Sequence, residues 1–253
     1  MILLVDIGNT RIKWALSRDG SLDQQRAAAH ATWTRADALA AFESIAPPAR
    51  VLVSNVGGEP IAALIRDTAR ELWSLEPEFI HSTASAAGIR NAYSEPAKLG
   101  VDRWLAMIGA YASEQRPICV VSIGTAATID GVDATGRHLG GLIIPGPDLM
   151  VDSLLHNTSD IARRTQNGSI GTGVFANNTL GAIKQGAAHA AAALIERAVA
   201  TMREQLGESP TLVISGGASS EVASALGIPH VAMSDLVLRG LAVYATHADR
   251  GED

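Results

Sequence analysis

Two short stretches of this chain, about half a chain apart, repeat one pattern. Residues 5–13 read VDIGNTRIK and residues 121–129 read VSIGTAATI. Each begins with β-branched residues, breaks at a glycine (Gly8 or Gly124) beside small hydroxyl or amide residues, and then resumes an alternating pattern. This predicts a strand, a tight turn and a second strand, because glycine lets the backbone approach a ligand and turn N–H groups point outward. Two such turns indicate a duplicated fold that holds a polyphosphate between its halves.

Each half of the sequence predicts a hairpin followed by helices and further strands. Thr34, with Asp37 three residues later, is typical of a helix N-terminus. The expected strands are 2–6, 11–16, 50–55, 78–81, 117–122, 127–133, 138–144 and 211–215. The expected helices are 59–73, 101–114, 180–204, 218–226, a segment from 34 to before Pro47, and a closing helix from 234. We therefore expect an α/β fold of two related lobes, residues 1–115 and 116–253, with a cleft between them.

Composition excludes several classes of protein. The chain has 253 residues, 47% of them apolar, so it can bury a sizeable core and is not disordered. Its net charge of −6 argues against a nucleic-acid partner held by phosphate contacts. No apolar run approaches the ~18 residues needed to cross a membrane, and no signal peptide precedes the strand at Ile2. We expect a soluble cytoplasmic protein whose single cysteine, Cys119, is a small buried hydrophobic residue.

Common metal and nucleotide motifs are absent from the sequence. The seven histidines show no metal-ligand spacing, and we expect His138 and His230 to be surface or packing residues. No phosphate-binding Gly-x-x-x-x-Gly-Lys motif, dinucleotide-binding Gly-x-Gly-x-x-Gly or Gly-x-Ser-x-Gly elbow is present.

The first repeat carries residues suited to phosphate chemistry. Asp6 ends the first predicted strand and Gly8 begins the turn, so the carboxylate can hold Mg²⁺ through water while turn amides bind phosphate oxygens. Lys13, on the second strand, can add a positive charge toward the phosphate. The alternative is an ordinary β-hairpin with an Asn/Gly turn, and the second copy at 122–128 weighs against it.

The segment Gly100–Arg103 is a second candidate. Asp102 at a helix N-terminus would be stabilised as a carboxylate, as a general base requires, and Arg103 supplies charge toward an anionic group. An aspartate placed for the helix dipole, with a solvated arginine, is the alternative, and this segment alone favours that alternative. A third candidate, Ser215–Ser219, can admit a flat ring against bare backbone or form a plain βα turn.

Together these motifs resemble the type III pantothenate kinases, in the superfamily of acetate kinase, sugar kinases and actin. The resemblance covers nearly the whole chain and implies two duplicated ribonuclease H-like lobes of the actin-like ATPase type. It is carried by Asp6–Thr10, Lys98–Arg103, Gly124–Ala126 with Thr128 and Asp130, Gly140–Gly146, Asn178–Thr179 with Ala182, Ile183 and Gly186, and Ser215–Gly217.

The resemblance implies ATP-dependent phosphorylation of pantothenate to 4′-phosphopantothenate, the first step of coenzyme A biosynthesis. Asp102 matches the proton acceptor for the pantothenate hydroxyl as it attacks the γ-phosphate in line, and Arg103 is the second expected catalytic residue. Asp6 would organise Mg²⁺ through water. The expected ATP- and phosphate-binding residues are Asp6, Ile7, Gly8, Asn9, Thr10, Arg11, Ile12, Lys13 and Thr125. The expected pantothenate contacts are Tyr93, Gly100, Val101, Asp102, Arg103 and Thr179.

Members of the family are dimers that need a monovalent cation, so the resemblance implies a homodimer using K⁺ or NH₄⁺. Ser122 departs from the family, which commonly has at this position an aspartate that ligates the cation. A serine offers only a neutral hydroxyl. We therefore expect weak stimulation by K⁺ or NH₄⁺.

Two other functions remain open. A non-catalytic accessory or regulatory protein of the same fold is one, and the intact Asp6, Asp102 and Arg103 argue against it. A related sugar kinase or polyphosphatase is the other, and it would use a different acceptor or water as the nucleophile.

Overall fold

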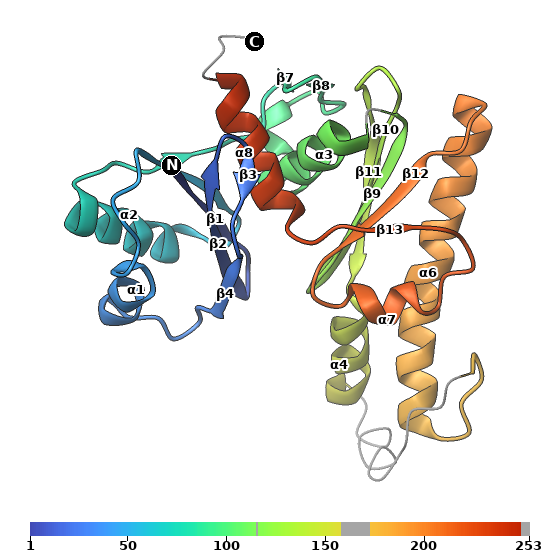
Figure 1. Cartoon of the computed structure of the whole chain (residues 1–253). Helices are drawn as coiled ribbons and strands as arrows, with labels where there is room; N and C mark the ends of the chain where they lie inside the picture. The colour runs from blue at the N-terminus through green and yellow to red at the C-terminus, as the bar shows by residue number, and fades with distance from the viewer. Residues whose placement is uncertain (115, 158–172, 249–253) are drawn as a thin grey trace. The chain divides into compact units, whose positions relative to one another are not determined.

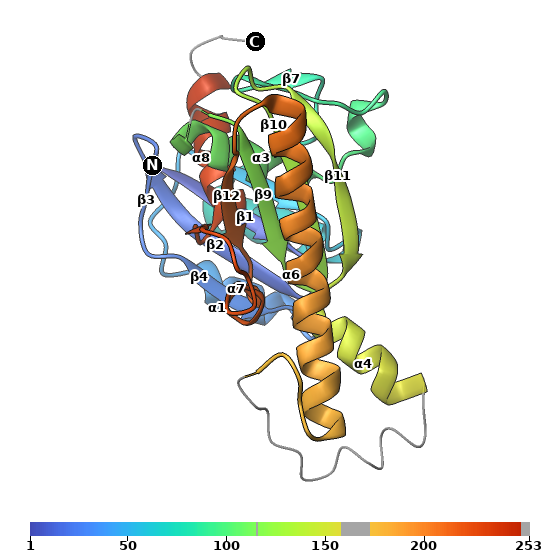
Figure 2. The same ribbon diagram turned by 90° about the vertical axis from the view of Figure 1, so that its right-hand side faces the viewer.

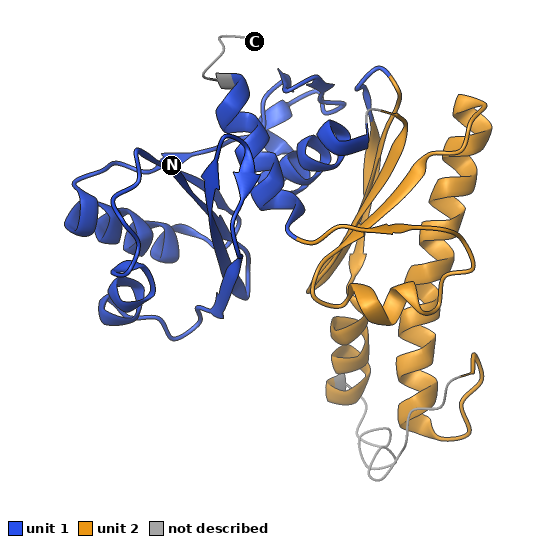
Figure 3. Cartoon of the chain, in the orientation of Figure 1, with its two compact units in different colours: residues 1–115, 135–138, 235–253 blue, residues 116–134, 139–234 orange. Residues whose placement is uncertain are grey.

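The computed structural model describes residues 1–114, 116–157 and 173–248 (Figures 1 and 2). The chain divides into two compact units (Figure 3). Unit 1 comprises residues 1–115, 135–138 and 235–253, and unit 2 comprises residues 116–134 and 139–234. Each unit contains one large β-sheet with helices, which confirms the predicted α/β class. The boundary after residue 115 and the cleft between the lobes remain predictions. Residues 235–253, which the sequence analysis assigned to the second lobe, belong to unit 1.

The predicted hairpin lies at the centre of the sheet of unit 1. Its strands are β1 (Ile2–Ile7), β2 (Arg11–Arg18), β3 (Ser21–Leu22), β4 (Arg26–Ala29), β5 (Arg50–Asn55) and β6 (Glu78–Phe79). They lie in the order β3-β2-β1-β5-β6, and β4 also pairs with β2. β1 is antiparallel to β2 and parallel to β5, so the end of β1 lies between two neighbours.

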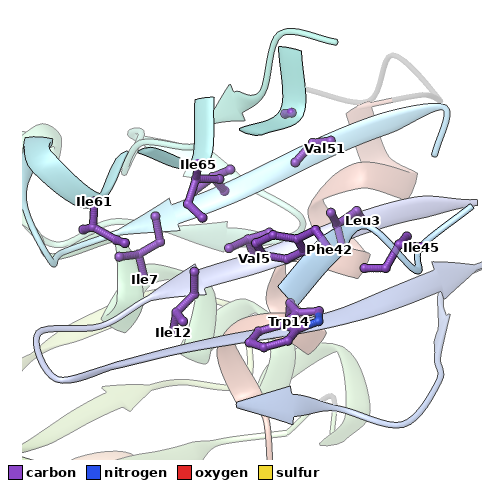
Figure 4. Packing of buried hydrophobic residues seen from close by; sticks show 12 residues of the cluster. Leu3, Val5, Ile7, Ile12, Trp14, Phe42, Ile45, Val51, Ile61 and Ile65 are labelled. Atoms are coloured by element: carbon purple, nitrogen blue, oxygen red, sulfur yellow. The ribbon is translucent and has the colours of Figure 1, made fainter. Parts of the chain in front are cut away.

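Two helices cover one face of this sheet: α1 (Arg35–Phe42) and α2 (Glu59–Trp73) (Figure 1). Leu3, Val5 and Ile7 alternate along β1 and point to this face. They are buried in one cluster with Trp14 and Phe42, whose ring centroids are 5.2 Å apart (Figure 4). Aromatic pairs at this distance add roughly 0.5–1.5 kcal/mol to the burial energy. This cluster fixes β1 and therefore the position of its last residues.

Two helices cover the opposite face: α3 (Val101–Glu114) and α8 (Leu236–Ala248). Leu4 of β1 packs there with Leu105. The two helices touch at glycines, because a Cβ on Gly109 would lie 2.8 Å from the Gly240 nitrogen and a Cβ on Gly240 would overlap the Leu105 carbonyl. Asp6 is two residues after Leu4, so its side chain points to the same face as α3.

Between β6 and α3 the chain forms three short elements. They are β7 (Ser85–Ala86), β8 (Ile89–Arg90) and the 3₁₀-helix η1 (Pro96–Lys98). β7 and β8 pair with each other. The buried Ser82 hydroxyl donates to the Leu99 carbonyl (2.8 Å), which fixes the approach to α3.

The sheet of unit 2 has the same strand order as that of unit 1. Its strands are β9 (Ile118–Ile123), β10 (Ala126–Val132), β11 (His138–Pro145), β12 (Thr211–Ser215) and β13 (Val231–Ala232). They lie in the order β11-β10-β9-β12-β13, with β9 antiparallel to β10 and parallel to β12. The repeated sequence pattern therefore corresponds to a repeated topology.

The helices of unit 2 are α4 (Pro147–Asn157), α6 (Thr179–Leu206) and α7 (Ser219–Ala223). α6 runs along one face of the sheet (Figure 2), where Ala191 and Ile195 pack with Val121 and Ile129. α4 packs beside the N-terminal half of α6 (Figures 1 and 2).

Most predicted elements are confirmed. Thr34 caps α1 in a capping box with Asp37, and the buried Cys119 has its thiol pKa raised by burial to about 12. The helix predicted at 218–226 is shorter and ends at Ala223. The strand predicted at 78–81 is present as β6, whereas β3, β4, β7, β8 and β13 were not predicted, because two to four residues are too few to show alternation. No helix in the described residues has the length and apolarity to cross a membrane.

Candidate functional site

The carboxylate of Asp6 lies in a row of polar side chains across the sheet of unit 1. Strand register places Lys13 of β2 and Ser54 of β5 opposite Asp6 on its two sides. Side chains paired in this way point to the same face with Cβ atoms about 5 Å apart. Asp6 is only 7% exposed, and Ser54 is fully buried. A charged pair and a hydroxyl are thus held on the face that carries α3.

The surroundings of Asp6 fit a hydrated cation. Burial raises the pKa of its carboxyl to about 6; the charge of Lys13 lowers this pKa, and the charge of Asp102 raises it. The Ser54 hydroxyl is near enough to the Asp6 carboxylate to lower its pKa, yet Asp6 Oδ1 and Ser54 Oγ are buried without a hydrogen bond of good geometry in the described part of the chain. Buried oxygens of this kind are normally satisfied by water or an ion. These residues therefore fit Mg²⁺ held through water.

The turn after β1 is held in one conformation. The Gly8 N–H donates to the Arg11 carbonyl (3.0 Å). The Nε2 atom of His30 lies 2.7 Å from the Gly8 carbonyl oxygen, and since that oxygen can only accept, Nε2 carries the proton. A Cβ on Gly57 would lie 2.7 Å from the same oxygen, so only glycine fits there. The Gly8 carbonyl is thus fixed by neighbours from two other parts of unit 1.

The remaining residues predicted to bind phosphate fall into two groups. Asn9, Thr10 and Arg11 are exposed at the tip of the turn. The side chains of Ile7 and Ile12 are fully buried in the hydrophobic cluster under α1 and α2. Ile7 and Ile12 can therefore offer a ligand only their backbone groups.

The start of α3 presents the second pair of charged residues. The Gly100 carbonyl accepts from the Trp104 N–H (3.0 Å), which begins the helix. Asp102 Oδ1 accepts from the backbone N–H of Arg103 (2.9 Å). A Cβ on Gly100 would lie 2.7 Å from this oxygen, so glycine leaves room for the carboxylate. Because the charge of Asp102 acts on Asp6, the two carboxylates share one region of unit 1.

Tyr93 and Arg103 also lie together. The guanidinium Nη1 of Arg103 donates to the Tyr93 hydroxyl (3.0 Å), and its central carbon lies 5.8 Å from the centroid of the Tyr93 ring. Arg103 is buried, at 6% exposure. The structure therefore brings together the expected pantothenate contacts Tyr93, Gly100, Asp102 and Arg103.

In unit 2, uncharged residues occupy the strand positions that Asp6, Lys13 and Ser54 occupy in unit 1. Ser122 holds the position in β9 that Asp6 holds in β1, since it pairs with Thr128 of β10 and Ser215 of β12. The turn that follows is one residue shorter: the Gly124 N–H donates to the Ala126 carbonyl (3.0 Å).

Two glycines from other motifs close around this second turn. The Gly146 N–H donates to the Thr125 carbonyl (2.8 Å), and a Cβ on Gly146 would overlap the Gly124 carbonyl. Gly216 has φ +106°, and a Cβ there would overlap the Ile123 carbonyl. Three of the motifs singled out in the sequence thus meet at one turn. Its residue Thr125, like Thr179 at the start of α6, belongs to unit 2, and the roles of both remain predictions.

Sequence reasoning gave no role at these sites to Ser54 or His30, and expected His138 only at the surface or in packing. Ser54 could have been found, because it is the last but one residue of the predicted strand 50–55 and parallel strands end at one edge of a sheet. His30 and His138 carry no local signal. His138, expected at the surface or in packing, is buried and stacks on Tyr93, with ring centroids 6.2 Å apart.

The fold defines the class of protein. Component A of the (R)-2-hydroxyglutaryl-CoA dehydratase from Acidaminococcus fermentans is similar over 100% of this chain and 99% of that chain, with 14% identity and a TM-score of 0.58. Together with other solved structures that cover nearly the whole chain, it shows the fold of the actin-like ATPases and sugar kinases.

Sequence comparison then gives the family. The family model described as type III pantothenate kinase matches residues 2–201. The type III pantothenate kinase of Aromatoleum aromaticum is 40% identical over 248 residues, covering 97% of this chain and 98% of that protein. The one from Nitrosococcus oceani is 37% identical over 248 residues, covering 96% and 92%. The chain belongs to the type III pantothenate kinase family.

Proposed function

We propose that this chain transfers the γ-phosphate of ATP to the primary hydroxyl of pantothenate, giving 4′-phosphopantothenate in the cytoplasm, the first step of coenzyme A biosynthesis. The family supports the reaction. The observation that carries the assignment of roles is the shared region of Asp6 and Asp102, since the charge of one raises the pKa of the other. A phosphate-binding turn and a candidate base for the acceptor hydroxyl are thereby part of one unit.

In this proposal Asp102 accepts the proton of the hydroxyl as its oxygen attacks the γ-phosphorus and the bond to the ADP oxygen breaks. Arg103 and Lys13 offset negative charge on the phosphoryl oxygens. Asp6 holds the water ligands of Mg²⁺, which when bound neutralises charge on the β- and γ-phosphates. Asp102 is half-buried, and Arg103 beside it is 6% exposed.

Binding of the two substrates follows from the same residues. The exposed turn at 8–11 and Thr125 would take the phosphates of ATP. Tyr93, the segment Gly100–Arg103 and Thr179 would contact pantothenate. The fixed Gly8 carbonyl supports this role, because a turn held by its neighbours presents its amides without further ordering.

The proposed function is tested by ADP release from ATP in the presence of pantothenate, simple sugars, acetate or no acceptor. Of these conditions, we expect ADP release only when pantothenate is the acceptor. Release without an acceptor would favour a polyphosphatase, release with sugars a sugar kinase, and no release an accessory protein of the same fold.

We also propose a homodimer formed through β11 and α4. β11 is an edge strand, and exposed apolar residues lie on it and on the helix that follows: Leu142, Ile143, Leu149 and Leu154 are 43–61% exposed. Apolar groups exposed together on an edge strand are typical of an interface.

Ile143→Asp should convert the dimer to a monomer, because a second copy would have to bury the new charge. Sedimentation velocity at several concentrations checks this. Val231→Asp is the matched control, since Val231 is an exposed apolar residue on β13, the opposite edge of the same sheet. A monomeric wild type, or a dimeric Ile143→Asp variant, would contradict the proposed interface.

The neutral row at Ser122 leads to a prediction on monovalent cations. Ser122, Thr128 and Ser215 bring no charge to a cation, which neutral oxygens compensate poorly unless several converge. K⁺ or NH₄⁺ should therefore stimulate the wild type weakly or only at high concentration, and Ser122→Asp should increase the response.

Activity is compared in K⁺, NH₄⁺, Na⁺ and a bulky organic cation at equal ionic strength. Ser122→Asn is the control of similar size without charge. Saturable activation of the wild type by K⁺ at low millimolar concentration would contradict the prediction. So would a folded Ser122→Asp variant that has no greater response to K⁺ than Ser122→Asn.

A further inference from the structure

A short segment from the second half of the sequence is part of unit 1. Residues 135–138, the hairpin tip between β10 and β11, pack on β8 and on the residues just before and after it. The Arg90 N–H donates to the Gly136 carbonyl (2.9 Å), and Arg90 Nη2 donates to the Thr135 hydroxyl (3.2 Å). Gly136 has φ +77°, and a Cβ there would overlap the Gly88 carbonyl, so the tip can pack this closely only with glycine.

His138 ends this hairpin tip and contacts the loop at two points. Its Nδ1 atom accepts from the Ala92 N–H (3.4 Å), which leaves the proton on Nε2 in the neutral ring. Its ring stacks on that of Tyr93 with an interplanar angle of 11° and a centroid distance of 6.2 Å. His138 is only 2% exposed, whereas Ala92 is exposed and Tyr93 is half-buried.

Tyr93 in turn contacts Arg103. The Tyr93 hydroxyl accepts from Arg103 Nη1, and the guanidinium also lies over the Tyr93 ring. The loop itself is held by Asn91, whose Oδ1 accepts from the Tyr93 N–H (3.0 Å) and whose Nδ2 donates to the Thr83 carbonyl (3.1 Å). The Tyr93 backbone is therefore held by its own loop, whereas its ring contacts His138 and Arg103.

We propose that His138 is a positioning residue for acceptor binding, which acts by setting the plane of the Tyr93 ring and through it the direction of the Arg103 guanidinium. The inference rests on the proposed function, in which Tyr93 and Arg103 contact pantothenate. A long arginine side chain loses much rotamer freedom when it is held. A partner already fixed in place removes part of that cost from substrate binding.

The test uses three substitutions that separate the two contacts. His138→Phe keeps a ring for stacking and loses the acceptor, His138→Asn keeps an acceptor near the Nδ1 position and loses the ring, and His138→Ala loses both. We expect His138→Ala to raise the KM for pantothenate by about 10-fold, with the KM for ATP changed less than about twofold. His138→Phe should stay closer to the wild type than His138→Asn, because the ring carries the effect.

A double-mutant cycle with Tyr93→Ala shows whether His138 acts through Tyr93. On the Tyr93→Ala background, His138→Ala should raise the KM for pantothenate no further, since the ring that it orients is gone. Equal effects on the two backgrounds would overturn the inference. So would an unchanged KM for pantothenate in His138→Ala, or an equal rise in both KM values.

A spectroscopic measurement separates this inference from the proposed function. The chain has three tyrosines, so fluorotyrosine labelling gives three ¹⁹F resonances, and Tyr93→Phe identifies that of Tyr93. The Tyr93 resonance should shift in His138→Ala, because the ring current of the imidazole is lost, and shift less in His138→Phe. An unshifted resonance in a folded variant would overturn the inference whatever the activity. A wild type that releases no ADP with pantothenate would overturn the proposed function instead, even with the resonance shifted.

Discussion

Asp102→Asn should lower kcat by about 10²-fold or more while ATP still binds. The substitution keeps the shape and the hydrogen bond from the Arg103 N–H to the side-chain oxygen, and removes the carboxylate that we propose as the proton acceptor. Steady-state kinetics with pantothenate and ATP measure the change in kcat. Equilibrium binding of ATP to the variant shows that the nucleotide site is intact.

Asp148→Asn is a matched control for this experiment. Asp148 is the second residue of α4, as Asp102 is the second residue of α3, so both carboxylates interact with a helix N-terminus. The two substitutions should cost similar stability, and only Asp102→Asn should affect turnover. Near-normal kcat in Asp102→Asn would mean that Asp102 only stabilises the helix.

Asp6→Asn should raise the KM for Mg²⁺-ATP by at least about 10-fold, because a neutral amide holds the hydrated cation less well than a carboxylate. In the wild type the same weakening should appear as the pH falls below about 6, where the buried Asp6 is protonated in the free enzyme. Titration of activity with Mg²⁺ between pH 5 and 8 measures both effects. The KM of Asp6→Asn should show no such dependence on pH, and a parallel dependence in the variant would show that another group titrates.

The charged form of Asp6 favours the binding of Mg²⁺-ATP, but in the protein without ligands it should lower the stability of the fold. Its pKa is raised from 3.8 to about 6 in the folded state, so the fold binds this proton more tightly than the unfolded chain does. The free energy of unfolding contributed by Asp6 is therefore highest below pH 4 and falls as the pH rises through 6, by about 3 kcal/mol. Asp6→Asn lacks this titration, so its stability relative to the wild type should increase from pH 4 to pH 8.

Denaturant unfolding at each pH measures this difference. Asp67→Asn is the control, because the Asp67 side chain is 66% exposed on α2. Saturating Mg²⁺-ATP should stabilise the wild type more than the Asp6→Asn variant. If Asp6→Asn unfolds at neutral pH with unchanged activity per folded molecule, Asp6 is only part of an ordinary hairpin.

A contact could be predicted from the sequence when its residues lie close together along the chain. The pairing of Asp6 with Lys13 follows from a tight hairpin, and the cap at Thr34 follows from Asp37 three residues later; both are local. The stacking of His138 on Tyr93 joins residues 45 positions apart, and no periodicity reports such a contact. Likewise, an apolar stripe on a helix predicts that the helix packs on something without specifying the sheet, so the location of α8 was not predictable.

The location of α8 has a consequence for the synthesis of the protein. The turn after β1 is made long before α8, yet the sheet face that carries Leu4 has only α3 to cover it until the 13 residues of α8 have left the ribosome. Domains usually fold in the order of their synthesis. Here the unit begun first must be the last to finish, so a nascent chain stopped before residue 236 should remain open to proteases at its N-terminal half.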